Sequence, residues 1–227
     1  MKKGKLIIIE GTDCSGKETQ SNLLVNFLNL NGYATKKFSF PNYNSATGKI
    51  IAGPYLGKKG FGEPLFNEGA SNVDPYCASL LYAMDRKYNI NTILNELNNG
   101  INIVLDRYVL SNMAHQASKL TPQTEEHMFY FIERLEYELL ELPRPDLQIF
   151  LHMPTWATNE LKKNRPEAPD QHESNTNYLR KSEQAYLKLA QKYNCKIIEC
   201  TNNKTIKTIN QINLELTQLV YNWMKNN

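Results

Sequence analysis

LIIIEGTDCSGKET, residues 6–19, is the stretch that decides the fold of this chain. Its four leading apolar residues predict a buried strand, and the residues from Lys17 onward predict a helix. The loop between them has a glycine at each end, Gly11 and Gly16, so its backbone can curl until successive N–H groups point at phosphate oxygens. Lys17 can then bridge the β- and γ-phosphates of ATP. The alternative is a glycine-containing turn between strand and helix that binds nothing.

The residues expected to bind ATP are this loop and the start of the helix. They are Gly11, Thr12, Asp13, Cys14, Ser15, Gly16, Lys17, Glu18 and Thr19. A phosphate-binding loop ordinarily has Ser or Thr after the Lys, where the hydroxyl reaches Mg²⁺, whereas Glu18 stands here. Its carboxylate could ligate Mg²⁺ through water, could turn outward while Thr19 packs inward, or could weaken catalysis. We expect activity to be retained because the other catalytic parts are present.

Outward from the loop, apolar runs suited to buried parallel strands alternate with longer amphipathic stretches. Further strands are expected at residues 35–40, 101–105, 147–151 and 195–200, and helices at 17–30, 47–56, 74–100, 111–142 with a break at Thr121-Pro122, 155–163, up to 193, and from 206 to the C-terminus. This rhythm predicts an α/β fold in which helices flank a parallel sheet with right-handed crossovers. Residues 1–227 are expected to form one domain, with a lid segment at about 160–176.

Two helical stretches carry apolar side chains at helical spacing. In the helix expected from Asp74 to Gly100, the buried stripe is predicted to comprise Leu80, Leu81, Met84, Tyr88 and Leu97. In the helix that follows Pro122, the stripe is formed by Phe129, Ile132, Leu135 and Leu139. The second stripe is interpreted as core or as a dimer surface.

Composition excludes several classes of protein. Of the 227 residues, 41% are hydrophobic and 22% are charged, and the net charge of +3 is too small to indicate a nucleic-acid or membrane-surface protein. The apolar run at residues 6–9 is shorter than a signal peptide requires, and no other segment is long enough to span a membrane. The four cysteines form no C-x-x-C pair, so a reducing, cytoplasmic compartment is expected.

A second chemical signal is the stretch IVLDRY at residues 103–108. An apolar strand that ends in Asp106 is typical of the edge of a parallel sheet where Mg²⁺ and its waters are held. Arg107 lies at the same edge, and its planar donors suit a substrate phosphate. The alternative is an ordinary ion pair at the end of a strand.

With these residues in view, the chain resembles the thymidylate kinases over nearly its whole length. The resemblance is carried by residues 11–17 with Thr19-Gln20, Phe40-Pro41, residues 82–86, Asp106-Arg107-Tyr108 with Ser111, Pro145-Asp146-Leu147, and a stretch like a lid near Arg165. It implies the five-stranded sheet of P-loop nucleoside monophosphate kinases, a homodimer, and transfer of the γ-phosphoryl group of ATP to dTMP with Mg²⁺. The products would be ADP and dTDP, for dTTP synthesis.

The resemblance also implies roles for individual residues. The catalytic residues would be Lys17, Asp13, Arg107 and Arg165, the metal would be held by Asp106 and Glu18, and dTMP would be bound by Asp13, Phe40, Tyr82, Arg86, Arg107, Ser111 and Gln116. Asp13 would contact the sugar 3′-hydroxyl. Tyr82 and Arg86 lie one helical turn apart, so the ring can stack on a pyrimidine while the guanidinium binds a carbonyl on its edge. The alternative is a surface tyrosine beside a solvated arginine.

Two departures from the family pattern affect the charge around the phosphates. Many relatives have an Arg after Phe40-Pro41, whereas Asn42 and Tyr43 follow here, so phosphate binding is expected to depend on Arg107 and on Lys49. Cys14 stands where one branch of the family has a catalytic Arg. The cation at the migrating phosphoryl group is therefore expected from the lid: Arg165, or else Lys162, Lys163 or Arg180.

Two other functions stay open at this point. A deoxynucleoside kinase of the same superfamily would need a carboxylate base, which Glu10 would have to provide. Its acceptor would have no phosphate for Arg107 to bind. A nucleotide-binding module that lost turnover through Glu18 would bind ATP and dTMP without forming product.

Overall fold

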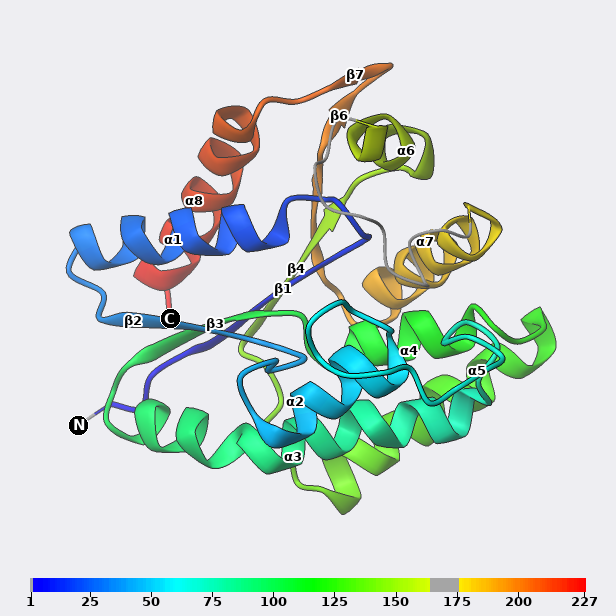
Figure 1. Cartoon of the computed structure of the whole chain (residues 1–227). Coiled ribbons are helices and arrows are strands. Elements are labelled where there is room, and N and C mark those ends of the chain that lie inside the picture. The colour runs from blue at the N-terminus through cyan, green and yellow to red at the C-terminus, as the bar shows by residue number, and fades with distance from the viewer. Residues whose placement is uncertain (1, 164–175) are drawn as a thin grey trace.

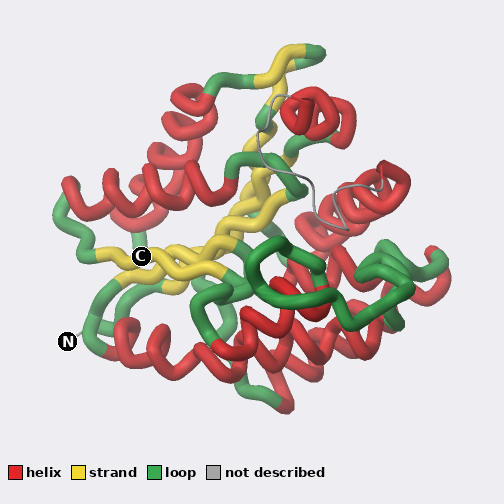
Figure 2. The backbone as a smooth tube through the Cα atoms, in the orientation of Figure 1, coloured by secondary structure: helices red, strands yellow, loops and turns green. Residues whose placement is uncertain are grey.

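The structure is a computed structural model that describes residues 2–163 and 176–227. Its centre is a five-stranded sheet in the order β2-β3-β1-β4-β5, in which every neighbouring pair is parallel. The strands are β1 (Leu6–Gly11), β2 (Thr35–Ser39), β3 (Asn102–Asp106), β4 (Leu147–His152) and β5 (Lys196–Glu199). Figure 2 shows them in yellow as one twisted band between layers of helices. The predicted α/β class with five parallel strands is confirmed.

The helices lie on both faces of the sheet (Figure 1). They are α1 (Lys17–Leu30), α2 (Ala46–Ile50), α3 (Pro75–Asn98), α4 (Val109–Ala117), α5 (Pro122–Glu133), α6 (Thr155–Lys163), α7 (Thr176–Lys192) and α8 (Ile209–Lys225), with π-helical turns at Ile51–Tyr55 and Arg134–Leu139. The core on one face is formed with α1 and α8, and the core on the other with α3, α4, α5 and α7. None of the described helices is both long enough and apolar enough to cross a membrane.

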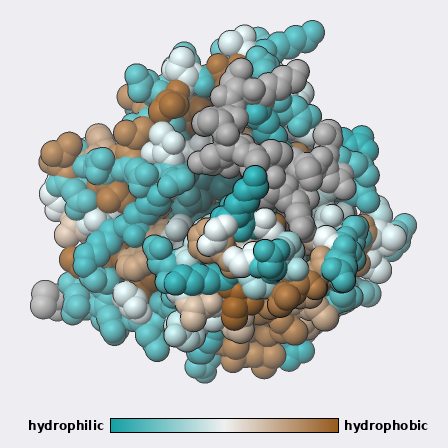
Figure 3. Space-filling view, in the orientation of Figure 1, coloured by the Kyte–Doolittle hydropathy of each residue, from teal (hydrophilic) through white to brown (hydrophobic). Residues whose placement is uncertain are grey.

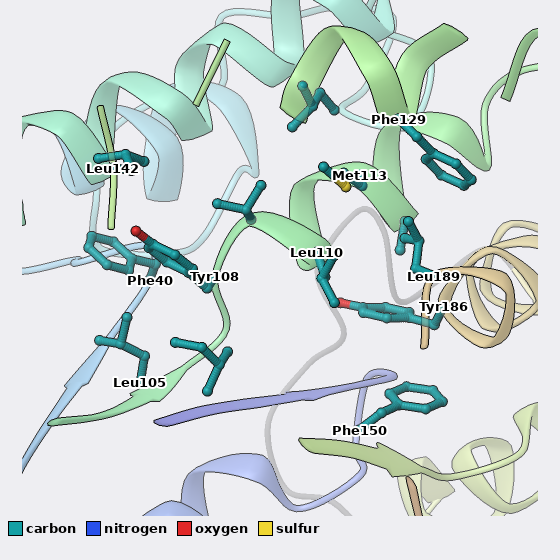
Figure 4. Packing of buried hydrophobic residues seen from close by; sticks show 14 of the residues in the cluster. Phe40, Leu105, Tyr108, Leu110, Met113, Phe129, Leu142, Phe150, Tyr186 and Leu189 are labelled. Carbon is teal, nitrogen blue, oxygen red and sulfur yellow. The ribbon is translucent and has the colours of Figure 1, made fainter. Parts of the chain in front are cut away.

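Alternation along β1 explains why its residues 6–9 form an unbroken apolar run. Leu6 and Ile8 belong to the core that α3, α4, α5 and α7 cover, and Ile7 and Ile9 belong to the core that α1 and α8 cover. Successive side chains of a strand point to opposite faces, so a central strand is apolar at consecutive positions where a core covers both faces. Figure 4 shows the first of these cores, with aromatic rings from β4, α7 and the residues after β3 packed around α4.

The register of the strands brings the two chemical signals together. Ile9 of β1 is paired with Asp106 of β3, and Gly11 is paired with Leu151 of β4. Ser39, at the end of β2, is also paired with Asp106. The loop after β1 and the residues after β3 therefore leave the sheet at the same carboxyl edge, where open α/β sheets bind ligands.

The helix α3 begins as predicted but buries a different side. Asp74 caps it by accepting a hydrogen bond from Cys77 N at 2.9 Å. The predicted buried stripe is wrong, because Leu80, Met84 and Tyr88 are 49%, 39% and 63% exposed, although Leu97 is buried. Polar side chains occupy part of the inward side, and hydrogen bonds satisfy them there. The inward residues are Ala78, Ser79, Ala83, Asp85, Arg86, Ile90, Ile93 and Leu97.

Two other element boundaries differ from the expectation. The region 111–142 divides at Thr121-Pro122 as predicted, and Pro122 opens α5, but the Thr121 side chain accepts no capping hydrogen bond from the helix. The C-terminal helix begins at Ile209, capped by Thr208, and Ile206 lies before it in the hairpin of β6 (Thr201–Asn202) and β7 (Thr205–Ile206). This hairpin is too short for a periodic pattern to reveal it.

Candidate active site

The loop between β1 and α1 is built as a phosphate-binding loop. Gly16 has φ of 77°, in the left-handed region that glycine favours, and a side chain at Gly11 would come within 2.9 Å of Leu151 O. Thr12 Oγ1 donates to Met153 O at 2.8 Å, and Thr158 Oγ1 donates to Asp13 O at 3.2 Å. These bonds fix the loop to the residue that follows β4 and to α6.

The Lys17 ammonium lies inside this loop. Its Nζ donates to Thr12 O at 2.7 Å and to Ser15 Oγ at 3.4 Å, and the residue is 7% exposed. Burial and the neighbouring charge of Arg107 lower the pKa of Lys17 to about 8, against the opposing effect of Asp106, Asp13 and Glu10. The side chain is thus a desolvated cation held where the loop receives phosphate oxygens.

A cavity opens beside the loop at the edge of the sheet. It is lined by Cys14, Ser15, Gly16, Lys17, Glu18, Thr19, Gln20, Asp106, Arg107, Met153, Leu161, Ile206, Lys207, Ile209 and Ile212. The polar loop forms one wall, and apolar residues from β7 and α8 form another. This combination suits a nucleotide, whose phosphates need N–H donors and whose base needs an apolar surface.

Both residues expected at the metal, Asp106 and Glu18, line this cavity. Among residues 2–163 and 176–227 no cluster of three or more His, Cys, Asp or Glu side chains could hold a metal by itself. Mg²⁺ keeps several waters and usually takes only one or two carboxylates together with substrate phosphates, so this donor set fits it. Glu18 and Thr19 are both exposed, and the alternative in which Thr19 packs inward is wrong.

Arg107 is held in place by a network at the end of β3. Its backbone has φ of 68°, an uncommon conformation for a residue with a side chain. Nη2 forms an ion pair with Asp13, and Nη1 donates to Ser111 Oγ at 3.2 Å and to Tyr186 OH at 3.1 Å. Burial would lower the pKa of Arg107, but the Tyr186 and Asp13 groups raise it. The guanidinium is therefore always charged and fixed in orientation.

Glu10 connects the loop to the start of α4. Its carboxylate accepts hydrogen bonds from Tyr108 N at 2.8 Å, Ser111 N at 3.2 Å and Ser111 Oγ at 2.6 Å. The residue is completely buried, which raises its pKa, while the hydrogen bonds oppose that effect. Glu10 lines neither this cavity nor the second one described below, so it is not placed as a base on a substrate hydroxyl.

A second cavity adjoins the first across Arg107. It is lined by Asp13, Phe40, Pro41, Tyr43, Leu56, Lys58, Tyr82, Arg86, Arg107, Ser111, Asn112 and His115. Six of the seven residues expected at dTMP are among them. The exception is Gln116, which is completely buried, and its amide atoms make no hydrogen bond to any described residue. Helical geometry explains this difference, since the neighbouring His115 occupies the side of α4 that faces the cavity.

Arg86 is buried in an ion pair, so the alternative of a solvated arginine is wrong. It is 2% exposed, and it binds Glu136 through Nε and through Nη2, the latter at 2.6 Å from Oε1. Asn112 Nδ2 also donates to Glu136 Oε1, at 2.9 Å. Beside it, the Tyr82 ring meets Tyr55 edge-on at 5.8 Å between centroids. The carboxylate thus positions the guanidinium in the cavity wall.

Of the cations expected near the phosphates, one is placed elsewhere by the structure and another lies outside the described residues. Lys49 is exposed and lines neither cavity, whereas Lys58, which no pattern in the sequence selects, lines the second. Lys58 lies in a glycine-rich loop, where no periodic pattern of residues could indicate that it faces a cavity. Arg165 lies outside the described residues. Of its substitutes, Lys162 is half-buried on α6 and Arg180 is exposed on α7.

Together these features define a class of protein. A phosphate-binding loop at the carboxyl edge of a parallel sheet, with an arginine that lines both the nucleotide cavity and an adjacent one, is the arrangement of a P-loop phosphotransferase acting on a nucleotide.

Comparison with known proteins gives the family. The sequence model of the thymidylate kinase family matches residues 9–212, so the chain belongs to the thymidylate kinase family. The human thymidylate kinase is 30% identical over 67% of this chain and 62% of its own length, and that of Mycobacterium tuberculosis H37Rv is 31% identical over 78% and 79%. A solved thymidylate kinase structure from Candida albicans superposes with a TM-score of 0.74 at 26% identity, covering 99% of this chain and 94% of that one.

The family confirms the expected class of activity: a kinase that uses ATP to phosphorylate dTMP. The deoxynucleoside kinase and the inactive nucleotide-binding module are not favoured. The position of Glu10, away from both cavities, agrees with this result.

Proposed function

We propose that the two adjoining cavities bind the two substrates of this reaction, ATP beside the loop of residues 11–17 and dTMP in the cavity of Tyr82 and Arg86. The observation that carries the proposal is the position of Arg107, which lines both cavities and is fixed by Asp13. An arginine there can bind the acceptor phosphate at the point where it meets the γ-phosphate.

The phosphate groups of ATP are bound by the loop N–H groups and by Lys17. When bound, Mg²⁺ would neutralise charge on the β- and γ-phosphates, and Asp106 and Glu18 are the residues that would hold it, directly or through water. Arg107 orients the acceptor phosphate for in-line attack. Asp13 keeps Arg107 in place and accepts a hydrogen bond from the sugar 3′-hydroxyl. These roles act by positioning and charge, as phosphoryl transfer requires.

The base of dTMP is recognised at the opposite end of the cavity. Tyr82 and Phe40 supply apolar and aromatic surface, and Arg86 donates to a carbonyl on the edge of the pyrimidine. Two of its guanidinium nitrogens are engaged by Glu136, and Nη1 makes no hydrogen bond to any residue within the described ranges. This nitrogen is therefore the donor that the base can use.

The state of assembly that we propose is a homodimer. One surface cavity is almost entirely apolar and is lined by Leu80, Leu81, Ala83, Met84, Lys87, Tyr88, Leu135 and Leu140, which we call the α3 apolar face. Figure 3 shows brown side chains gathered there, along the lower edge of the molecule. Exposed apolar patches of this kind mark protein interfaces. The partner is a second copy of the chain, because the family resemblance implies a homodimer.

We also propose a cellular location for the protein and a class of substrates that it binds. The four cysteines are free thiols, which supports a reducing, cytoplasmic location. The net charge of +3 supports small-molecule substrates in place of a nucleic acid polymer. The catalytic role of Arg165 stays a prediction.

The experiment that tests the proposed function is an assay of all nucleoside monophosphates with Mg·ATP. We expect dTMP to give the highest kcat/KM and product to be ADP and dTDP. The Candida albicans thymidylate kinase has broad substrate specificity, so the panel includes purine and ribose nucleotides. Lys17→Ala should abolish transfer, since losing such a contact costs on the order of 3 kcal/mol or more in the transition state. Near-normal kcat in this variant would reject the assignment of the loop.

A further inference from the structure

We propose that Asp85 is a positioning residue for the acceptor site, because it fixes the segment that follows β2, residues 40–45, against α3. This inference rests on the proposed function, since it assumes that the cavity of Tyr82 and Arg86 takes dTMP. Asp85 lines neither cavity. It therefore acts on the acceptor through the residues that it holds in place.

The Asp85 carboxylate is buried and accepts hydrogen bonds from this segment and from α2. The residue is 1% exposed, on the inward side of α3. Its Oδ2 accepts from Asn42 N at 2.8 Å, and its Oδ1 accepts from Ser45 Oγ at 3.1 Å and from Thr47 Oγ1 at 2.6 Å. One turn further along α3, Asn89 Nδ2 donates to Oδ1 at 2.9 Å. Burying a carboxylate is costly unless donors satisfy it, so these bonds determine where the segment lies.

The helix α2 holds the same segment from another side. Ser45 caps α2, since its Oγ accepts a hydrogen bond from Gly48 N at 3.0 Å, and its own N donates to Asn42 O at 2.9 Å. Gly48 permits this close packing, because a side chain there would bring its Cβ within 1.8 Å of Asn42 O. Asn42 Nδ2 also donates to Asn89 Oδ1 of α3 at 2.9 Å. Asn42 is therefore fixed between α2 and α3.

The fixed segment forms part of the wall of the acceptor cavity. Its residues that line the cavity are Phe40, Pro41 and Tyr43. Two of these directly flank Asn42, the residue whose backbone N–H Asp85 binds. The next residue of α3, Arg86, lines the same cavity. Asp85 therefore fixes the segment after β2 relative to the arginine that we propose for the base, and the precision of such positioning determines how well a ligand binds.

The test separates the position of the segment from the stability of the fold. Binding of dTMP and of ATP is measured by calorimetry, and Tm by thermal unfolding, for the wild type, Asp85→Asn, Thr47→Val, Thr47→Ser and the control Asn102→Ala. Thr47→Val removes one donor to Asp85 without changing any charge, and Thr47 does not line the cavity. We expect Asp85→Asn and Thr47→Val to weaken dTMP at least about fivefold, because small misplacements of binding groups are costly. ATP affinity should stay within about twofold.

Asn102 provides the matched control, because it is a buried polar side chain at the opposite edge of the sheet. It is 8% exposed at the start of β3, where Oδ1 accepts from Lys5 N at 3.0 Å and Nδ2 donates to Ala34 O at 3.1 Å. Asn102→Ala should lower Tm and leave both affinities within about twofold. Thr47→Ser keeps the hydroxyl and should bind dTMP like the wild type.

Kinetics complete the test, since KM for dTMP should rise in Thr47→Val while KM for ATP does not. Destabilised Asp85→Asn and Thr47→Val variants with unchanged dTMP affinity, or with equal losses of dTMP and ATP affinity, would overturn the positioning role. A loss confined to Asp85→Asn would assign the effect to the charge beside Arg86 and would also overturn it. If Asp85→Asn does not fold, Thr47→Val decides. A wild-type protein that binds no nucleoside monophosphate would instead reject the proposed function, and this inference with it.

Discussion

Arg86 and Glu136 hold each other in a buried bidentate ion pair, although 50 residues separate them in the chain. Their side chains are 2% and 0% exposed. Burial alone would lower the pKa of Arg86, but the charge and hydrogen bonds of Glu136 raise it. The π-helical turn after α5 therefore supplies the carboxylate that positions the expected base-binding arginine on α3.

Substitution of this carboxylate is expected to affect both stability and the acceptor site. Glu136→Gln leaves a buried guanidinium without its counter-charge, which typically costs about 3–5 kcal/mol. We expect a lower free energy of unfolding in urea and a higher KM for dTMP with little change for ATP. The control is Glu138→Gln, which removes only an exposed pair with Arg134 and should change stability by less than about 1 kcal/mol. Equal effects of the two variants would contradict the positioning role.

The pH dependence of the reaction should reflect Lys17. Its pKa is lowered to about 8, so the free enzyme loses this positive charge as the pH rises through about 8. Only the protonated ammonium attracts phosphates, and we therefore expect kcat/KM for ATP to fall above that pH. In the ATP complex the phosphates favour the charged form, so kcat should fall at higher pH than kcat/KM. A profile that stays flat to about pH 9.5 would show that the group is not desolvated as described.

The pair of Asp13 and Arg107 should matter for catalysis more than its partial exposure suggests. Asp13→Asn keeps the shape of the side chain but removes the charge that holds Nη2 of Arg107, a group common to both cavities. We expect kcat/KM for dTMP to fall about tenfold or more, near 1.4 kcal/mol. Steady-state kinetics with dTMP varied at saturating ATP give this value, and an unchanged kcat/KM would remove Asp13 from the site.

The proposed homodimer can be broken at the α3 apolar face. Met84→Glu puts a charge into a surface that is otherwise almost entirely apolar, so we expect monomers by sedimentation velocity at micromolar concentration. The matched control is Leu30→Glu, because Leu30 is 88% exposed at the end of α1 and does not line that face. A dimeric Met84→Glu variant, or a wild-type monomer, would contradict this assembly.

Local patterns predicted the fold well and the packing of α3 poorly. The apolar run of β1, the glycines of the loop and the Asp74-Pro75 start of α3 each act within a few residues, so the sequence contains their whole signal. The inward side of α3 depends instead on distant partners. Arg86 can be buried because Glu136 and Asn112 are buried beside it. A prediction from helical spacing of apolar residues instead places an arginine on the solvent-facing side.

The same limit applies to the candidate site. Lys17, Asp106 and Arg107 could be placed because each lies at or shortly after the end of a parallel strand, and parallel strands finish at a common edge. Lys58 reaches the cavity through a turn whose shape depends on backbone hydrogen bonds. The sequence also could not show which side of α4 carries Gln116, because one position along a helix turns a side chain by about 100°.

The hydrogen bonds between Glu10 and the start of α4 affect how the two proposed substrates would be positioned relative to each other. Glu10 directly precedes Gly11, the first residue of the loop, and its carboxylate accepts the backbone hydrogens of Tyr108 and Ser111 on either side of the start of α4. One peptide bond and a few buried hydrogen bonds thus connect the loop that we propose for the donor phosphates to the residues beside Arg107, which we propose for the acceptor phosphate. We therefore expect substitutions around the base to change the choice of substrate without changing the distance between the two phosphates.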